Sequence, residues 1–216
     1  MIPIRDNIPT RHFPFITVII MIINILVFFY EITLPEEELE QLVYKFGLLP
    51  EDVFGFNIAN LVTHMFLHGD FGHIIGNMLF LWVFGNNVED VLGRLNFILF
   101  YLLSGILAAF LQSIVSLLSG DVSTPMIGAS GAVSGILAAY TRLFPFGKIL
   151  TFIPPFIFLI FTLPAWFFIG YWFILQILYA MFVPVSMGGV AWYAHIGGFL
   201  AGWFLVPSFL KGPLKL

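Results

Sequence analysis

Residues 96–118 read NFILFYLLSGILAAFLQSIVSLL and contain no Asp, Glu, Lys or Arg. A helix of this length crosses a hydrocarbon core about 30 Å thick, because each helical residue adds about 1.5 Å. The chain as a whole is also apolar: of its 216 residues, 60% are hydrophobic and 9% are charged. Soluble domains average roughly 45–50% apolar and 25% charged residues, so the sequence predicts an integral membrane protein.

Other apolar runs flank this segment, separated by polar residues, Gly or Pro. Together the runs lie at about 14–31, 73–92, 96–118, 126–144, 164–183 and 190–209. The stretch 149–163 is also apolar, but Pro154 and Pro155 interrupt it and it is too short to span. We therefore interpret 149–163 as an interfacial segment that leads into the fifth span.

The distribution of basic residues favours six spans and a cytoplasmic N-terminus. In that topology the outer segments carry only Lys45, and the inner segments carry Arg5, Arg11, Arg94, Arg142, Lys148, Lys211 and Lys215. An excess of Lys and Arg inside is the rule for membrane proteins, and a seventh span would move Lys211 and Lys215 outside. The predicted fold class is an all-α, polytopic bundle of six transmembrane helices with both termini cytoplasmic. Its parts are a cytoplasmic N-terminal segment 1–13, a membrane domain 14–210 and a cytoplasmic tail 211–216.

The first outer loop, at about 32–72, is long and acidic. A loop of this length usually has structure of its own, so we expect an interfacial helix near 35–46. The chain has a formal charge of -4 and no basic cluster, so no nucleic-acid partner is expected. It has no Cys, which excludes disulfides and thiol nucleophiles.

One candidate for chemistry is Ser130, in Gly128-Ala129-Ser130-Gly131 at the start of the fourth apolar run. Serine in a helix often bonds a backbone carbonyl one turn earlier, so Ser130 alone is weak evidence for catalysis. The small residues around it allow a neighbouring helix to approach closely. Close packing accounts for the glycines, but it does not account for a hydroxyl at the mouth of a helix.

A second candidate is His195, which lies early in the sixth run with Gly198 and Gly202 following it. This spacing of glycines also indicates a close-packing helix face. A histidine inside a span should face the protein interior and pair with a hydroxyl or a carbonyl. His195 could be a structural residue of that kind or a functional one.

His73 and Asn77 are spaced i, i+4 at the start of the second run, so their side chains project from one face about 6 Å apart. Either could be an interhelical hydrogen-bonding residue, which is the commoner use of Asn in membranes. Their other use would be to donate hydrogen bonds to an oxyanion.

Depth in the membrane links the candidates, because the second, fourth and sixth helices all enter from outside in this topology. Counting about 1.5 Å per residue, Asn77 and His195 lie roughly 6 and 9 Å below His73, which is near the outer boundary. Ser130 lies roughly 7 to 17 Å deep. These side chains can therefore converge in the outer half of the bilayer.

The predicted chemistry is a Ser130/His195 dyad. His195 would take the proton of Ser130 and later return it to the leaving amine. His73, Asn77 and the Ser130 backbone N–H would stabilise the oxyanion. No carboxylate shares this depth, so no acidic third member is expected.

Neither a metal nor a cofactor is expected. The sequence has no H-E-x-x-H, and His64, His68 and His73 lack a helical spacing that would bring all three to one zinc ion. We interpret His64 and His68 as structural. Paired intramembrane aspartates and phosphate-binding glycine loops are also missing from the sequence. A transporter or channel is disfavoured because there are no paired half-helices and no intramembrane carboxylates.

From Pro9 to Gly202 the sequence resembles the rhomboid family of intramembrane serine proteases. Three motifs in order carry the resemblance: His73-x-x-x-Asn77, Gly128-Ala129-Ser130-Gly131 and Ala194-His195-x-x-Gly198-x-x-x-Gly202. The resemblance implies a six-helix bundle in which Ser130 is the nucleophile, His195 the base, and His73 and Asn77 assist the oxyanion. It also implies a water-filled cavity open to the outer side and gated by the fifth helix and the loop at about 183–190.

Two positions depart from the family pattern. Ala59-Asn60 stands where many members have a Trp-Arg pair, which affects the shape of the outer loop. Ser134 stands where some members have a Tyr that packs beneath the catalytic His. We expect the chemistry to be kept and the packing to differ.

The predicted protein is a multi-pass protein of the cell membrane whose active site opens to the extracytoplasmic side. Its partners would be the lipid bilayer and transmembrane protein substrates, cleaved in or near their membrane segments. The alternative is a catalytically silent rhomboid-like scaffold that binds membrane clients. Loss of the serine or the histidine would mark that class, whereas Ser130 and His195 are both present.

Overall fold

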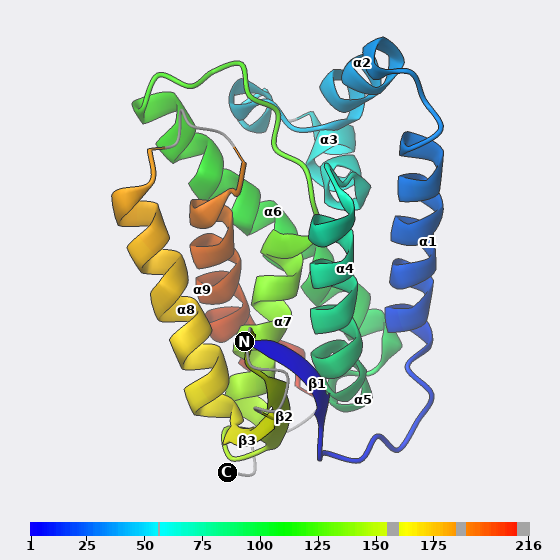
Figure 1. The fold of residues 1–216 in the computed structure, drawn as a ribbon, viewed down its shortest axis with the longest axis vertical. Coiled ribbons are helices and arrows are strands. Elements are labelled where there is room, and N and C mark those ends of the chain that lie inside the picture. The colour runs from blue at the N-terminus through cyan, green and yellow to red at the C-terminus, as the bar shows by residue number, and fades with distance from the viewer. Residues whose placement is uncertain (56, 155–159, 185–188, 211–216) are drawn as a thin grey trace.

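The computed structural model describes residues 1–55, 57–154, 160–184 and 189–210, and it forms a bundle of helices with a small sheet at one end (Figure 1). The α-helices are α1 (Phe15–Glu31), α2 (Glu36–Phe46), α3 (Ile58–Thr63), α4 (Phe71–Phe80), α5 (Asn86–Leu92), α6 (Arg94–Leu118), α7 (Ser130–Leu143), α8 (Ala165–Phe182) and α9 (Trp192–Phe209). Short 3-10 segments are η1 (Pro50–Val53) and η2 (His64–Phe66), and η3 (Leu81–Gly85) is a π-helical turn. The strands are β1 (Ile2–Asp6), β2 (Lys148–Phe152) and β3 (Ile160–Pro164).

Each predicted apolar run contains a helix, so the helical class is confirmed. The second run forms α4, η3 and α5 without a break in helical backbone geometry. By length and apolar character, α6 and α8 could each cross a membrane, and α1 is a shorter apolar helix. The number of spans and their orientation stay predictions. The predicted tail 211–216 and residues 185–188 of the predicted gating loop lie outside the described residues.

Helix α7 lies in the middle of the bundle, with α4 on one side of it and α8 and α9 on the other (Figure 1). All its residues from Gly131 to Tyr140 are buried. Small side chains make this possible, because Gly and Ala let neighbouring backbones approach closely. The residue that opens this central helix is Ser130.

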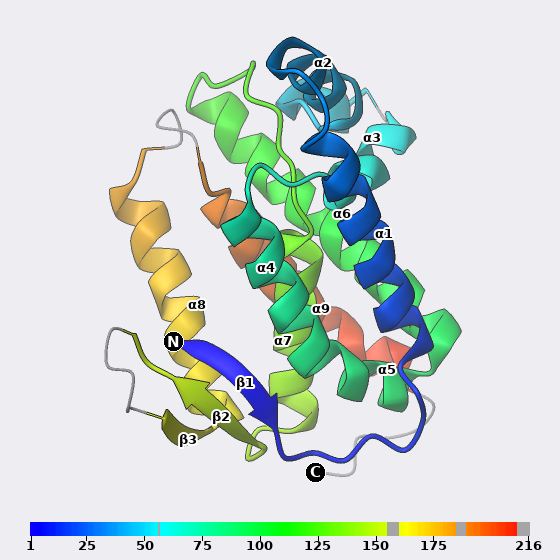
Figure 2. The same cartoon turned by 45° about the vertical axis from the view of Figure 1, so that its right-hand side comes forward.

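The small sheet was not expected from the sequence. Its order is β1-β2-β3, and both pairs are antiparallel. Figure 2 shows the strands side by side near the N-terminal end of α8, with β3 running directly into that helix. β1 comes from the predicted cytoplasmic N-terminal segment 1–13. β2 and β3 lie largely within the segment 149–163 that was predicted as interfacial, of which 155–159 lie outside the described residues.

The outer loop is structured, and α2 lies where a helix was predicted near 35–46. The Asn60 side chain donates to the Gly47 carbonyl at 2.9 Å, and the Thr63 hydroxyl donates to the Phe46 carbonyl at 2.7 Å. Asn60 is one of the positions that depart from the family pattern, and it tethers the end of α2. An isolated β-bridge between Leu48 and Met126 then ties the outer loop to the segment that precedes Ser130.

Candidate active site

Ser130 is the first residue of α7, and the chain directly before it is not helical. Gly128 has a φ of 115°, a conformation that residues with a Cβ rarely adopt, and its N–H donates to the His64 carbonyl at 2.8 Å. The N-cap residue is Ala129, and it makes no side-chain cap hydrogen bond. The N–H groups of the first turn of α7 are therefore not occupied by a capping side chain, and such groups bind anions well.

The ring of His73 lies directly against Gly128. A Cβ built on Gly128 would be 2.6 Å from both Cε1 and Nε2 of His73. His73 is held in the first turn of α4, where its backbone N–H donates to the Asp70 carboxylate at 2.9 Å. Glycine at position 128 thus serves both the turn and the approach of His73 to the nucleophile segment.

Helices α7 and α9 touch through glycine. A Cβ on Gly198 would clash with the Gly131 carbonyl, and one on Gly202 would clash with the Gly135 carbonyl. The predicted packing roles of Gly131, Gly198 and Gly202 agree with these contacts. Because the backbones meet there, the first turn of α9, which carries His195, is brought close to the first turn of α7.

His195 is buried, and its Nδ1 lies 2.7 Å from Oε1 of Gln176 on α8. Its ring packs at a tilt on Trp172, with centroids 5.8 Å apart, and perpendicular to Trp192 at 5.9 Å. Sequence reasoning missed Gln176, although an amide within an otherwise apolar span was a visible signal, since polar residues in spans are often functional. His195 therefore has a polar partner other than a carboxylate.

Ser134 does not take the place of a tyrosine beneath His195. Its hydroxyl donates to the Ser130 carbonyl one turn earlier, at 2.6 Å, as serine in helices often does. The aromatic contacts of His195 come instead from α8 and from the first residue of α9.

The predicted oxyanion residues form a small cluster with His68. The Asn77 amide donates to Nε2 of His68 at 3.0 Å, and the rings of His68 and His73 meet edge to face with centroids 5.0 Å apart. A primary amide has two N–H donors, so Asn77 keeps a second one. His64 is held separately, with Nδ1 2.8 Å from the Asn60 carbonyl. Within the described part of the chain, no His, Asp and Glu side chains group in a way that could hold a metal ion.

The predicted catalytic and oxyanion residues line one cavity of about 600 Å³. Its polar and aromatic lining includes Asp70, His73, Asn77, Ser130, Ser134, Trp172, Gln176, Trp192 and His195. Among the described residues no hydrogen bond joins Ser130 to His195, and such bonds often tighten only when substrate is bound. The structure thus brings together side chains from α4, α7, α8 and α9.

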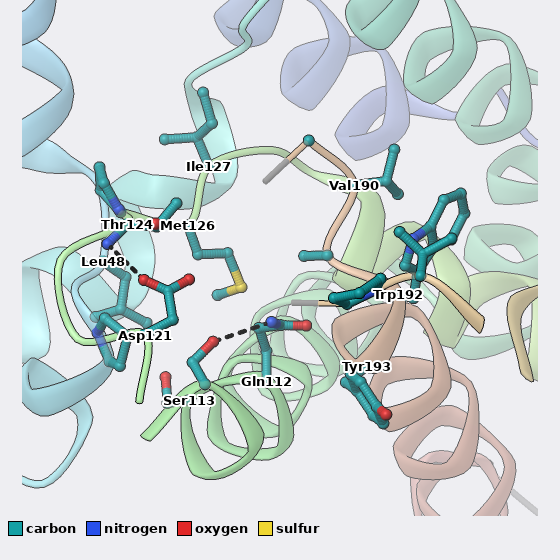
Figure 3. Close-up of a pocket in the computed structure, with 17 residues that line it drawn as sticks. Leu48, Gln112, Ser113, Asp121, Thr124, Met126, Ile127, Val190, Trp192 and Tyr193 are labelled. Atoms are coloured by element: carbon teal, nitrogen blue, oxygen red, sulfur yellow. Dashed lines mark hydrogen bonds between the residues drawn. The ribbon is translucent and has the colours of Figure 1, made fainter. Parts of the chain in front are cut away.

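A second, smaller cavity of about 80 Å³ lies beside the start of α9. In the view of Figure 3, Gln112 of α6 lies between Asp121 and Trp192. The Gln112 side chain donates to the Ser116 hydroxyl at 3.2 Å and accepts from the Ala194 N–H at 3.2 Å. Gln112 therefore secures the backbone next to His195 from the side opposite to α8.

Several known proteins are similar to this chain in sequence. A family model described as "Rhomboid domain" matches residues 56–212. Rhomboid protein 1, mitochondrial, of Saccharomyces cerevisiae is 31% identical over 169 residues, which are 74% of this chain and 45% of that protein. Presenilin-associated rhomboid-like protein, mitochondrial, of Homo sapiens is 31% identical over 99 residues, which are 45% of this chain and 26% of that protein. The chain thus matches less than half the length of either relative.

Proposed function

The chain belongs to the rhomboid family, the family of intramembrane serine proteases, and on that basis we propose that it is an intramembrane serine endopeptidase. One observation carries the proposal: Ser130 and His195 line the same cavity, each from the first turn of its helix. A nucleophile and a base on facing helices are what acyl transfer by a serine requires.

In the proposed reaction, His195 Nε2 accepts the Ser130 proton as Oγ bonds to the carbonyl carbon of the scissile peptide. The tetrahedral intermediate collapses, the C–N bond breaks, and His195 returns the proton to the leaving nitrogen. Water then attacks the acyl-enzyme with His195 again as base, and the serine is released. No acid beyond the histidine is needed for the proton balance.

Negative charge on the intermediate would be stabilised from two sides. The uncapped first turn of α7 offers backbone N–H groups, beginning with that of Ser130. His73 and Asn77 line the same cavity, and in the proposed reaction His73 and the second N–H of Asn77 serve as side-chain donors. Donors fixed before the reaction stabilise the oxyanion without having to reorganise.

The proposed setting is a membrane that the chain crosses six times, with both termini on the inner side and the cavity open to the outer side. The basic residues of the predicted inner segments support this orientation. We propose transmembrane proteins as substrates and expect no metal or cofactor. The relatives named above are mitochondrial, whereas the location expected from the sequence is the cell membrane.

The test is cleavage of a single-span substrate by purified protein in liposomes, comparing wild type with Ser130→Ala and His195→Ala. Wild type should cleave, and each variant should lose activity, because each removes one partner of the proton transfer. Folding of the variants is checked by thermal unfolding. Undiminished cleavage by either folded variant would rule out the dyad. A wild type that captures the substrate uncut, like Ser130→Ala, would favour the scaffold alternative.

A further inference from the structure

The Gln176 amide has a single orientation that satisfies its neighbours. Its Nε2 donates to the Trp172 carbonyl at 3.0 Å, one helical turn earlier in α8, and its Oε1 faces His195 Nδ1 at 2.7 Å. Turning the amide over would place Oε1 against a carbonyl oxygen, and two acceptors cannot share a hydrogen bond. The backbone of α8 therefore determines which end of the amide His195 meets.

That orientation determines where the imidazole carries its proton. A neutral imidazole has one N–H and one bare nitrogen, and Oε1 of Gln176 can only accept. Nδ1 must then be the donor, which leaves Nε2 bare. A bare nitrogen is what a base needs in order to take a proton from a serine hydroxyl.

Both helices around this contact are anchored. The Tyr193 hydroxyl donates to the Ala180 carbonyl at 2.9 Å, and Trp192 stacks on Tyr179 with centroids 4.6 Å apart. These contacts join the start of α9 to the end of α8. Gln176 is itself only 5% exposed, so water does not compete freely for its amide.

We propose that Gln176 is the positioning residue of the active site: its carbonyl oxygen holds His195 in the tautomer protonated on Nδ1 and leaves Nε2 free to accept the Ser130 proton. This inference rests on the proposed protease function. Gln176 acts through His195 and need not touch substrate. It fills the place in which many serine hydrolases have a carboxylate.

The test compares Gln176→Met with Gln176→Glu in the liposome assay. Met keeps the shape but removes both hydrogen bonds, so kcat should fall about ten- to hundredfold with KM unchanged. A glutamate at position 176 keeps an acceptor for the Nδ1–H of His195, and when protonated it also donates to the Trp172 carbonyl. Gln176→Glu should therefore retain most of the wild-type activity. Gln41→Met, the same change on exposed α2, is the matched control and should behave as wild type.

A second readout does not depend on cleavage. In protein labelled with ¹⁵N-histidine, the His195 signals are assigned by their loss in His195→Ala, and the nitrogen that carries the proton is identified by NMR. Wild type and Gln176→Glu should carry it on Nδ1, and Gln176→Met should show a mixture. An unchanged tautomer together with wild-type kcat in Gln176→Met would overturn the role of Gln176 while leaving the protease function intact. If wild type cleaves no better than Ser130→Ala, the proposed protease function is wrong. If His195 of wild type carries its proton on Nε2, the positioning role of Gln176 is wrong whatever the cleavage result.

Discussion

Gly128→Ala tests the close contact between the His73 ring and Gly128, which lies two residues before Ser130. The new Cβ would occupy a backbone with a φ of 115°, and such strain costs about 1–3 kcal/mol. It would also lie 2.6 Å from the His73 ring, whereas carbon atoms are normally about 3.5–4.0 Å apart, so the ring must move by roughly 1 Å. Overpacking of this kind costs about 1–3 kcal/mol, and together we expect a loss of about 2–6 kcal/mol.

Gly120→Ala separates the two contributions. Gly120 has a φ of 77°, and nothing lies within 4 Å of the position its Cβ would take, so this variant carries backbone strain without a clash. It should lose only about 1–2 kcal/mol. In the double variant His73→Ala/Gly128→Ala the clash is gone, so the effects of the two single variants on stability should not add.

The assay is the free energy of unfolding in mixed micelles, measured by denaturant titration for each variant. Cleavage by Gly128→Ala should fall as well, because the displaced His73 lies beside the turn that presents Ser130. Equal losses in Gly128→Ala and Gly120→Ala would refute the close contact with His73. Strict additivity in the double variant would refute it independently.

Two further predictions concern the outer side of the site. Asn77→Ala should lower kcat by about a hundredfold without abolishing cleavage, because one oxyanion donor among several is lost; complete inactivity of a folded variant would contradict that role. Burial lowers the pKa of His64 from 6.5 to about 4, despite the opposing effect of the Asn60 carbonyl, so the unfolded chain takes up the proton first. The free energy of unfolding should therefore fall by about 3 kcal/mol between pH 6.5 and pH 4, and His64→Asn should lose this pH dependence. If the free energy of unfolding of His64→Asn changes with pH as steeply as that of wild type, the effect belongs to other groups.

The helices were predictable because the signal for each is local. The run at 96–118 predicts a helix by its length and lack of charge, and α6 covers it. Ser130 and His195 could be paired because charge counting placed both at the outer ends of their helices, and the structure brings both to one cavity. The ends of the apolar runs predicted the ends of the helices less well. The run predicted from 126 becomes helical only at Ser130, because Met126 forms a β-bridge with Leu48, which is remote in sequence.

The sheet was not predictable from such signals, because its strands pair across most of the chain. Ile2 lies opposite Phe152, and the Tyr140 hydroxyl reaches the Asp6 carboxyl at 2.6 Å. Five-residue strands have no periodicity that distinguishes them from a tail or an interfacial segment. Gln176 was missed for a related reason, since its role depends on a contact with His195, and that contact between two helices is visible only in the folded structure.

An amide suits this place in a membrane better than a carboxylate would. An ionised Asp beside His195 would have to be stripped of water in the bundle, at a cost of several kcal/mol unless other groups compensate for it. The Gln176 amide carries no charge, and both its ends are hydrogen-bonded, so burying it costs far less. What it gives up is the attraction of a negative charge for the protonated imidazole. The Gln176 amide thus orients His195 without adding an ionised group next to its ring.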